Sequence, residues 1–326
     1  MTPATETSSS LTDLSKLDLF LVGRLAEGLK EMRPGRHQVI GILCGLGSAL
    51  IWGGFPVVTR LGVARSSLDI FDITFLRFAV AGAALCPVLI SRGMRGTSLS
   101  ATALMVVGIG APYILIVSSG LTLAPVELFA AVTPGSMVGF CALLSFIWLK
   151  LRPSAAQILA TLLIVSGIAL AVAGQRNDFG GLNMSVAFFL AGGFLWAIYV
   201  TTTKAFAVDA LQATAMVSVG SAVFYVPAYF AIKGFSILDQ STHDVLVQSV
   251  YQGIFVSIVA LFFFSKCVEL LGAAVGSSFA SLVPVIAIAE ASIALGERPS
   301  AYSIAGAAVV VVGMILSVWS ALGTSR

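Results

Sequence analysis

Long apolar segments of about twenty residues follow one another along most of this chain, and about twenty apolar residues let an α-helix cross the hydrocarbon core of a bilayer. Ten such segments are separated by charged residues, glycine or proline, and they span 39–60, 69–91, 99–120, 126–149, 154–174, 184–206, 210–232, 245–266, 272–295 and 300–322. Because a chain in lipid must satisfy its backbone hydrogen bonds internally, each segment is expected to be helical. The sequence therefore predicts an all-α polytopic membrane protein with ten transmembrane helices.

The composition of the 326-residue chain supports a membrane location. Hydrophobic residues make up 58% of the chain and charged residues 10%, whereas soluble domains carry about 25% charged residues. So few charges cannot cover the surface of a soluble domain, but lipid can solvate an apolar surface. The net charge of +3 is small and scattered, which argues against a nucleic-acid partner.

The chain also repeats itself. The segments SALIWGGFPVVTR and GGFLWAIYVTTTK, 144 residues apart, each place a Trp in an apolar run with a basic residue eight positions later. The pairs are Trp52 with Arg60 and Trp196 with Lys204. These segments predict corresponding helices in two related halves of the chain.

A second pair of segments supports the repeat. RPSAAQILATLLIVSGIALAV, from Arg152, and RPSAYSIAGAAVVVVGMILSV, from Arg298, are identical at nine of twenty-one positions. The two matches occur in the same order, at offsets of 144 and 146 residues. We therefore expect five-helix repeats at 39–174 and 180–326. Since five is odd, the second repeat enters the membrane from the opposite side, which makes the repeats inverted.

The remaining residues, 1–38, are expected to form a cytoplasmic tail. Leucines recur there every three or four positions until Pro34 and Gly35, a pattern typical of an amphipathic helix on a membrane surface. With Arg77 left out as intramembrane, twelve Lys and Arg fall on the side of both termini and five on the other. This bias predicts cytoplasmic termini in a cell membrane of the bacterial inner-membrane type.

Several short motifs together resemble the drug/metabolite transporter superfamily, and the EamA-type permeases in particular. They are a Trp in the first span of each repeat, Arg77-Phe78 in the second span, a proline in spans four and nine, and GERPS at 296–300. The first repeat departs from the pattern, since LKLRPS at 149–154 lacks the acid. The resemblance implies a secondary active transporter, often an exporter, of small metabolites such as amino acids or related compounds.

Inverted repeats suit alternating access, because two similar halves can exchange conformations around a central site. A charge near the bilayer midplane costs about 2.5 to 3.5 kcal/mol on insertion scales, so it usually has a partner or a task. Glu290 is predicted to bind substrate and to carry a coupling proton, or else to form a structural ion pair. Arg77 is predicted to hold a substrate carboxylate, to pair with Glu290, or to extend towards the interface.

The other candidate residues bring aromatic rings or hydroxyl groups to the predicted centre. The further substrate-binding candidates are Trp52, Trp196, Tyr199 and Ser281. The prolines expected to kink helices are Pro56, Pro134 and Pro284.

An enzyme is not expected, since His37 and His243 are the only histidines and both fall outside the predicted spans. The four cysteines show no C-x-x-C spacing, so no metal site is expected, and no cofactor motif occurs. The expected partners are a small-molecule substrate and the lipid bilayer, with assembly as a homodimer left open. A membrane channel and a lipid scramblase, both without coupled transport, remain as alternative functions.

Overall fold

The computed structural model describes residues 36–150, 152–173 and 179–323. The predicted surface helix of the tail falls almost wholly outside these residues. In the first half, the helices are α2 (Arg36–Arg65), α3 (Ile70–Arg92), α4 (Leu99–Ile109), α5 (Ala111–Leu123), α6 (Val126–Leu149) and α7 (Ala155–Ala173). The second half contains α8 (Phe179–Ala205), α9 (Ala210–Lys233), η1 (Ser236–Asp239), α10 (Thr242–Gln248), η2 (Ser249–Val259), α11 (Ala260–Ala280), α12 (Val283–Ala294) and α13 (Ala301–Gly323).

The helices have the length and composition of membrane spans. Among the described residues, 8 helices are long and apolar enough to cross a membrane, and the apolar stretches Val283–Ala294 and Ala301–Ser317 are shorter. Large apolar side chains are exposed on the bundle, including Ile90 at 78%, Ile232 at 84% and Ile293 at 86%. A patchwork of such side chains is suited to lipid contact rather than to water. The prediction of an all-helical membrane protein is confirmed, while the count of ten spans stays a prediction.

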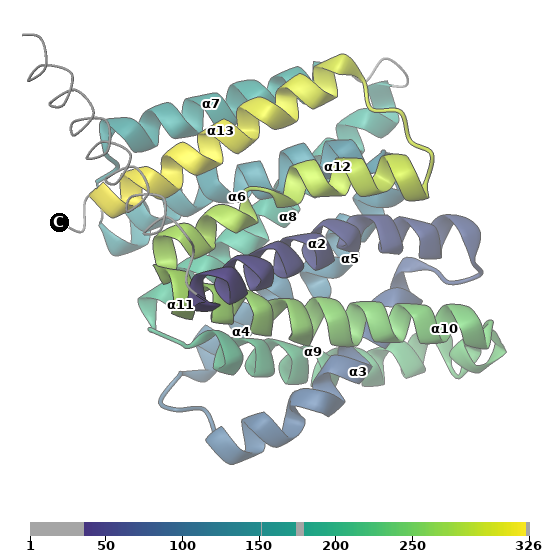
Figure 1. Ribbon diagram of the computed structural model, residues 1–326. Coiled ribbons are helices and arrows are strands. Elements are labelled where there is room, and N and C mark those ends of the chain that lie inside the picture. Colours follow the sequence, from purple (N-terminus) through teal and green to yellow (C-terminus); the bar gives the residue numbers. More distant parts are fainter. Residues whose placement is uncertain (1–35, 151, 174–178, 324–326) are drawn as a thin grey trace, which may run out of the picture.

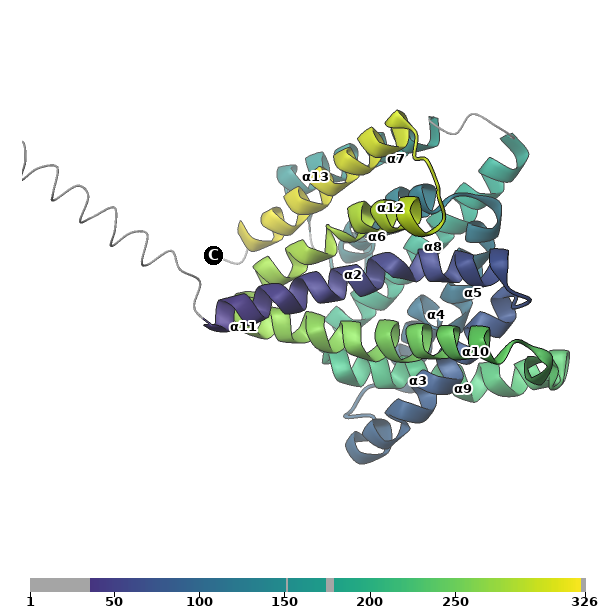
Figure 2. The ribbon, with the colours of Figure 1, turned by 45° about the vertical axis from the view of Figure 1, so that its right-hand side comes forward.

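The helices run alternately between two ends of the bundle. Arg36 and the last turns of α13 lie at one end, which we call the Arg36 end (Figure 1). The first helix finishes at the opposite end, which we call the Arg60 end. In both views α7 finishes and α8 begins at the Arg60 end (Figure 2). The second half of the chain therefore starts at the end opposite to the first half.

The two halves pack on each other reciprocally. The first helix of the first half, α2, packs mainly against α11 and α12, and its counterpart α8 packs mainly against α4, α5 and α6. Likewise α3 packs against its counterpart α9, and α7 against its counterpart α13. The contacts of a helix in one repeat are thus matched by the contacts of its counterpart in the other repeat. The bundle therefore has pseudo-twofold symmetry.

Close helix contact joins the two RPSA-containing segments. A side chain added at Gly167 of α7 would lie 2.7 Å from the carbonyl oxygen of Gly306 in α13. At the repeat-related Gly313, it would lie 2.9 Å from the carbonyl oxygen of Ala160. Glycine lets two helix backbones approach to this distance, as is common between membrane helices. The repeated glycine therefore serves the contact between the two repeats.

Two spans depart from regular helix at corresponding places. Gly110 separates α4 from α5, so the predicted span 99–120 is two helices. The residue 144 positions later lies in η2, a π-helix over Ser249–Val259. Non-α geometry leaves backbone groups without their usual partners, and π-helical segments occur frequently at functional sites. Gly110 is buried, and one face of η2, with Gln252, Gly253, Val256 and Ser257, is buried as well; neighbouring helices can satisfy backbone groups on that face.

The chain reverses direction within α11. Gly41, near the start of α2, lies against Leu271, while Gly45 lies against Phe279. Residues beyond 271 therefore run back along α2 towards the Arg60 end, as predicted for the start of the ninth span. Within the predicted span 272–295 the helix is interrupted, because residues 281–282 form a turn between α11 and α12. Pro284 accordingly lies in the first turn of α12.

The other two predicted kink positions lie inside helices: Pro56 in α2 and Pro134 in α6.

Ion pairs at both ends connect α3 with α9. At the Arg60 end, Nζ of Lys233 lies 2.7 Å from Oδ1 of Asp72 and 2.8 Å from Oδ2 of Asp69. The side chain of Asp72 is 1% exposed and also accepts a hydrogen bond from Tyr229 at 2.6 Å. At the Arg36 end, the two carboxylate oxygens of Asp209 each lie 3.4 Å from Nη1 of an arginine. Arg92 is the last residue of α3, and Arg95 follows it by three positions. Both contacts join an acid at the start of one helix to a base at or beyond the end of the other.

We expect Asp72→Asn to lower the free energy of unfolding by about 3 kcal/mol, because it leaves the partly buried Lys233 ammonium with one acid. The matched variant at the exposed cluster, Asp209→Asn, should lower it by less than about 1 kcal/mol. Unfolding of the purified chain in a neutral detergent measures both. Equal losses would contradict the difference in burial between the two clusters.

Candidate functional site

Arg77 of α3 places a cation inside the bundle, two turns from the start of its helix. Its Nη1 donates a hydrogen bond of 3.2 Å to Oε1 of Gln252 in η2. The guanidinium carbon lies 5.3 Å from the ring centre of Phe55 and 5.8 Å from that of Phe78. Both rings are buried, so aromatic faces stabilise the charge on one side.

Buried amide groups hold Gln252 in place. Its Nε2 donates to Oγ1 of Thr59 at 3.0 Å and lies 3.4 Å from Oε1 of Gln248. Gln248 in turn donates to the carbonyl oxygen of Val58 at 2.8 Å. Since both glutamines donate towards α2, the acceptor oxygen of Gln252 is left to face Arg77. A connected network of this kind fixes side-chain orientation.

Arg77 has no acidic partner among the described residues, whose ion pairs all involve other bases. Its Nε is buried and lacks a hydrogen-bond partner. The predicted pairing with Glu290 is therefore not formed in this structure. An arginine inside a bundle usually pairs with an acid, so the described residues leave the charge of Arg77 uncompensated.

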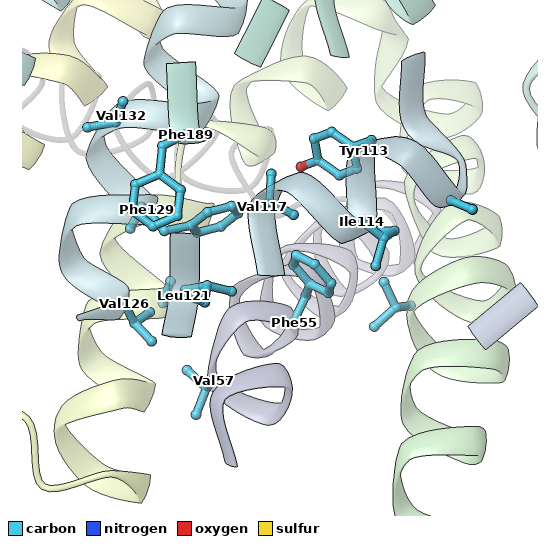
Figure 3. Close-up of a cluster of buried hydrophobic side chains, with 14 of the residues drawn as sticks. Phe55, Val57, Tyr113, Ile114, Val117, Leu121, Val126, Phe129, Val132 and Phe189 are labelled. Atoms are coloured by element: carbon cyan, nitrogen blue, oxygen red, sulfur yellow. The ribbon is translucent and has the colours of Figure 1, made fainter. Parts of the chain in front are cut away.

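Aromatic residues surround this position. Phe55 and Tyr113 belong to one buried cluster, drawn in Figure 3, to which α2, α5, α6 and α8 contribute. The ring of Tyr113 lies 6.0 Å from that of Trp196 in an edge-to-face arrangement. Phe55, Tyr113 and Trp196 thus connect the surroundings of Arg77 to α5 and α8 through one apolar cluster.

Glu290 lies on another side of α2. A side chain added at Gly54 would collide with the hydroxyl of Tyr251 and lie 2.9 Å from Oε2 of Glu290. The Tyr251 hydroxyl donates to the carbonyl oxygen of Ile51 at 2.9 Å. In the described part of the chain, Glu290 itself has no hydrogen bond or ion pair. The glycine therefore makes room for a partly buried, unpaired carboxyl group.

The remaining predicted residues occupy separate places. Trp52 lies 5.3 Å from Phe264, measured between ring centres, and its Nε1 lies 3.4 Å from the carbonyl oxygen of Val256. Tyr199 packs against α4 at Gly108. Ser281 is buried in the turn between α11 and α12.

The site candidates named from the sequence do not include Gln252, the partner of Arg77. The available indication was the spacing of Gln248 and Gln252, which places two amides on one face of an apolar helix. That pattern does not tell which neighbouring helix the amides meet.

A second polar cluster closes the Arg60 end. Nε of Arg60 lies 2.9 Å from Oε1 of Glu297 in an ion pair, without the alignment of a hydrogen bond. Nη1 of Arg60 donates to the carbonyl oxygens of Leu121 and Ala124, and the backbone N–H of Val126 donates to Oε2 of Glu297 at 3.1 Å. The cluster ties α2, α5 and α6 of the first repeat to the loop after α12 of the second.

The Arg36 end has no matching ion pair in the described part of the chain. Lys204, the counterpart of Arg60, is exposed and pairs with none of the described acids. The position 146 residues before Glu297 is Leu151, which cannot supply a charge. An ion pair between these repeat-related positions thus closes only the Arg60 end.

Burial raises the pKa of Glu297 above its ordinary value of 4.5, even though Arg60 and the N–H of Val126 lower it. The folded protein therefore holds this proton more tightly than the unfolded chain does. It follows that the free energy of unfolding contributed by Glu297 falls as pH rises from 4.5 through the raised pKa.

Comparison with known proteins agrees with the resemblance noted from the motifs. A family model described as the EamA-like transporter family matches the chain twice, over residues 39–173 and 183–319. Of the solved structures, 25 chains match. One, described as "Crystal structure of protein", superposes with a TM-score of 0.56 at 20% sequence identity, covering 88% of this chain and 99% of that chain; at this identity the likeness shows the fold alone. No curated protein matches the chain.

We expect Glu297→Gln to remove the pH dependence that Glu297 gives to the free energy of unfolding, because glutamine keeps the shape of the protonated acid and does not titrate. Between pH 4.5 and neutrality the wild-type protein should lose thermal stability relative to the variant. Melting curves in a neutral detergent over a pH series measure the difference. Glu269→Gln, at an exposed carboxylate, serves as the control and should follow the wild type. Parallel wild-type and Glu297→Gln curves would show that Glu297 does not titrate as described.

Proposed function

Because the chain belongs to the EamA-like transporter family, we propose that it is a secondary active transporter of small metabolites, such as amino acids or related compounds. It works by alternating access, with export as the expected direction. The cell membrane is the proposed location, with both termini in the cytoplasm. The lipid bilayer is the proposed surrounding partner, and a homodimer is the proposed assembly, which sedimentation in detergent can test.

One observation carries this proposal: a polar site lies within the bundle, and the ion pair of Arg60 with Glu297 joins the repeats at the Arg60 end, while the repeat-related positions in the described part of the Arg36 end form no such pair. Arg77 and its amide network are surrounded by helices of both halves. Arg60 and Glu297 join the halves at the Arg60 end. Separating these two residues is the first requirement for opening that end. Such a change in the contact between inverted repeats is what alternating access needs.

The proposed substrate-binding residues lie on both repeats. They are Trp52, Arg77, Trp196, Tyr199, Ser281 and Glu290. The proposed proton carrier is Glu290, because its carboxyl group is partly buried and has no partner in the described part of the chain. A carboxyl group in this setting can take up a proton without first breaking an ion pair.

Channel and scramblase functions are the alternatives. A channel needs a pore lined along its whole length, whereas the ion pair and backbone hydrogen bonds at the Arg60 end favour a gated carrier. Catalysis is not proposed, since the family to which the chain belongs is described by transport.

The proposal is tested by finding a substrate and measuring its flux. Cells with and without the chain are compared for metabolites released into the medium, and the metabolites that differ are offered to proteoliposomes containing the purified protein. A carrier gives saturable flux. Unitary currents, or lipid flipping with no solute flux, would replace the proposal by one of the alternatives.

We expect Glu290→Gln to abolish the dependence of flux on a pH gradient, because glutamine cannot carry the proton. Substrate binding should persist, since the side chain keeps its size. Flux in proteoliposomes with and without the gradient measures the change, and Glu269→Gln is the control. Gradient dependence that survives in Glu290→Gln would remove this residue from the coupling mechanism.

A further inference from the structure

The charge balance around Arg77 narrows the class of substrate, and this inference rests on the proposed function. The guanidinium has one hydrogen-bonding partner, the neutral amide oxygen of Gln252, and its buried Nε has none. Aromatic rings and neutral amides make up the rest of its described surroundings. A buried cation without an acid is costly, and an anion bound beside it removes that cost.

Three bases near the ends of the bundle differ from Arg77 in this respect. Arg60, Arg92 and Lys233 each contact an acid. In the interior, the nearest candidate acid in sequence reasoning was Glu290, which lies against Gly54 and Tyr251 instead. The residues at 36–150, 152–173 and 179–323 therefore do not supply the missing negative charge at Arg77.

The net charge of the ligand then decides between substrate classes. A monoanion neutralises Arg77, whereas an α-amino acid zwitterion brings a carboxylate and an ammonium together and leaves the site with one net positive charge. The ammonium would also lie a few ångströms from the guanidinium, with no acid there to accept it. Repulsion between like charges is strong where water is largely excluded.

The rings indicate what the rest of the ligand is. Phe55 and Phe78 lie under the guanidinium, and Tyr113, in the same buried cluster as Phe55, packs edge to face on Trp196. Rings so placed offer apolar faces beside the cation. A ligand with a carboxylate at one end and an apolar or aromatic body would meet the charge and the rings together.

We propose that Arg77 binds the carboxylate of a small organic monoanion that has an apolar or aromatic body and no ammonium group. Gln252 positions the guanidinium by accepting one of its N–H groups, which leaves other donors of the fork for the carboxylate.

The test compares ligands that differ by one group. 3-Phenylpropionate and phenylalanine share a carboxylate and a phenyl ring, and only phenylalanine carries the α-ammonium. Binding to the full chain in neutral detergent is measured by titration calorimetry. We expect 3-phenylpropionate to bind at least about tenfold more tightly than phenylalanine. 3-Phenylpropanamide, which lacks the charge, and inorganic phosphate, which lacks the ring, should both bind more weakly than 3-phenylpropionate.

Variants connect the preference to Arg77. Arg77→Gln should weaken 3-phenylpropionate binding by at least about tenfold, and Arg77→Lys should retain part of it, because the charge remains while the planar fork is lost. Arg65→Gln, at an exposed base of the Arg60 end, should bind as the wild type does. If Arg77→Gln does not fold, Arg77→Lys and the ligand comparison on the wild type still decide the matter.

Three outcomes overturn the inference: no binding of 3-phenylpropionate, equal binding of phenylalanine, or unchanged binding in Arg77→Gln. Failure of the proposed function gives a different result, because monoanion binding without flux in proteoliposomes would refute transport and leave the binding site intact. Saturable flux of zwitterions together with no monoanion binding would refute the inferred substrate class and leave the proposed transport function intact.

Discussion

The need to satisfy backbone hydrogen bonds without water governs this structure. In lipid, helices meet that need within one segment, and irregular backbone is tolerated only where protein covers it. The interruptions at Gly110 and at residues 281–282, and the π-helical segment η2, all lie in spans that pack against the opposite repeat. The places where helix geometry fails are therefore also the places where the two halves meet, which is where a carrier needs groups free to change partners.

Charges follow the same constraint. Asp72 and Lys233 pair at one end of α3 and α9, Asp209 contacts arginines at the other, and Arg60 pairs with Glu297. These contacts hold the ends of the bundle, where at least one member of each pair is partly exposed. Arg77 is different because it lies inside and is matched only by amides and rings. In the described part of the chain, the symmetry of the repeats is thus broken twice: the ion pair of Arg60 with Glu297 has no repeat-related counterpart, and the interior cation Arg77 has none either.

Particular residues show how far sequence reasoning reached. The start of α6 at Val126 and its end at Leu149 coincide with the predicted span 126–149, because charges and proline mark both limits in the sequence. The span with the turn at 281–282 was predicted to kink at Pro284, but the sequence did not place the turn itself, since hydropathy measures the apolar character of a segment and does not register where the helix ends. The contact of Arg77 with Gln252, 175 residues apart, could not be predicted from the sequence either. Periodicity gives the face of a residue on its own helix but not the helix that this face meets.

The sequence by itself determined a helical membrane protein with an internal repeat, because hydrophobic length and self-similarity are properties of the chain read in order. Tertiary structure alone decided that α7 and α13 meet through the repeated glycines, that Arg60 reaches Glu297, and that Arg77 lacks an acid while Glu290 lies elsewhere. The physical reason is that pairing depends on the relative rotation and spacing of helices far apart in sequence. Those quantities arise only when side chains of many segments pack at once.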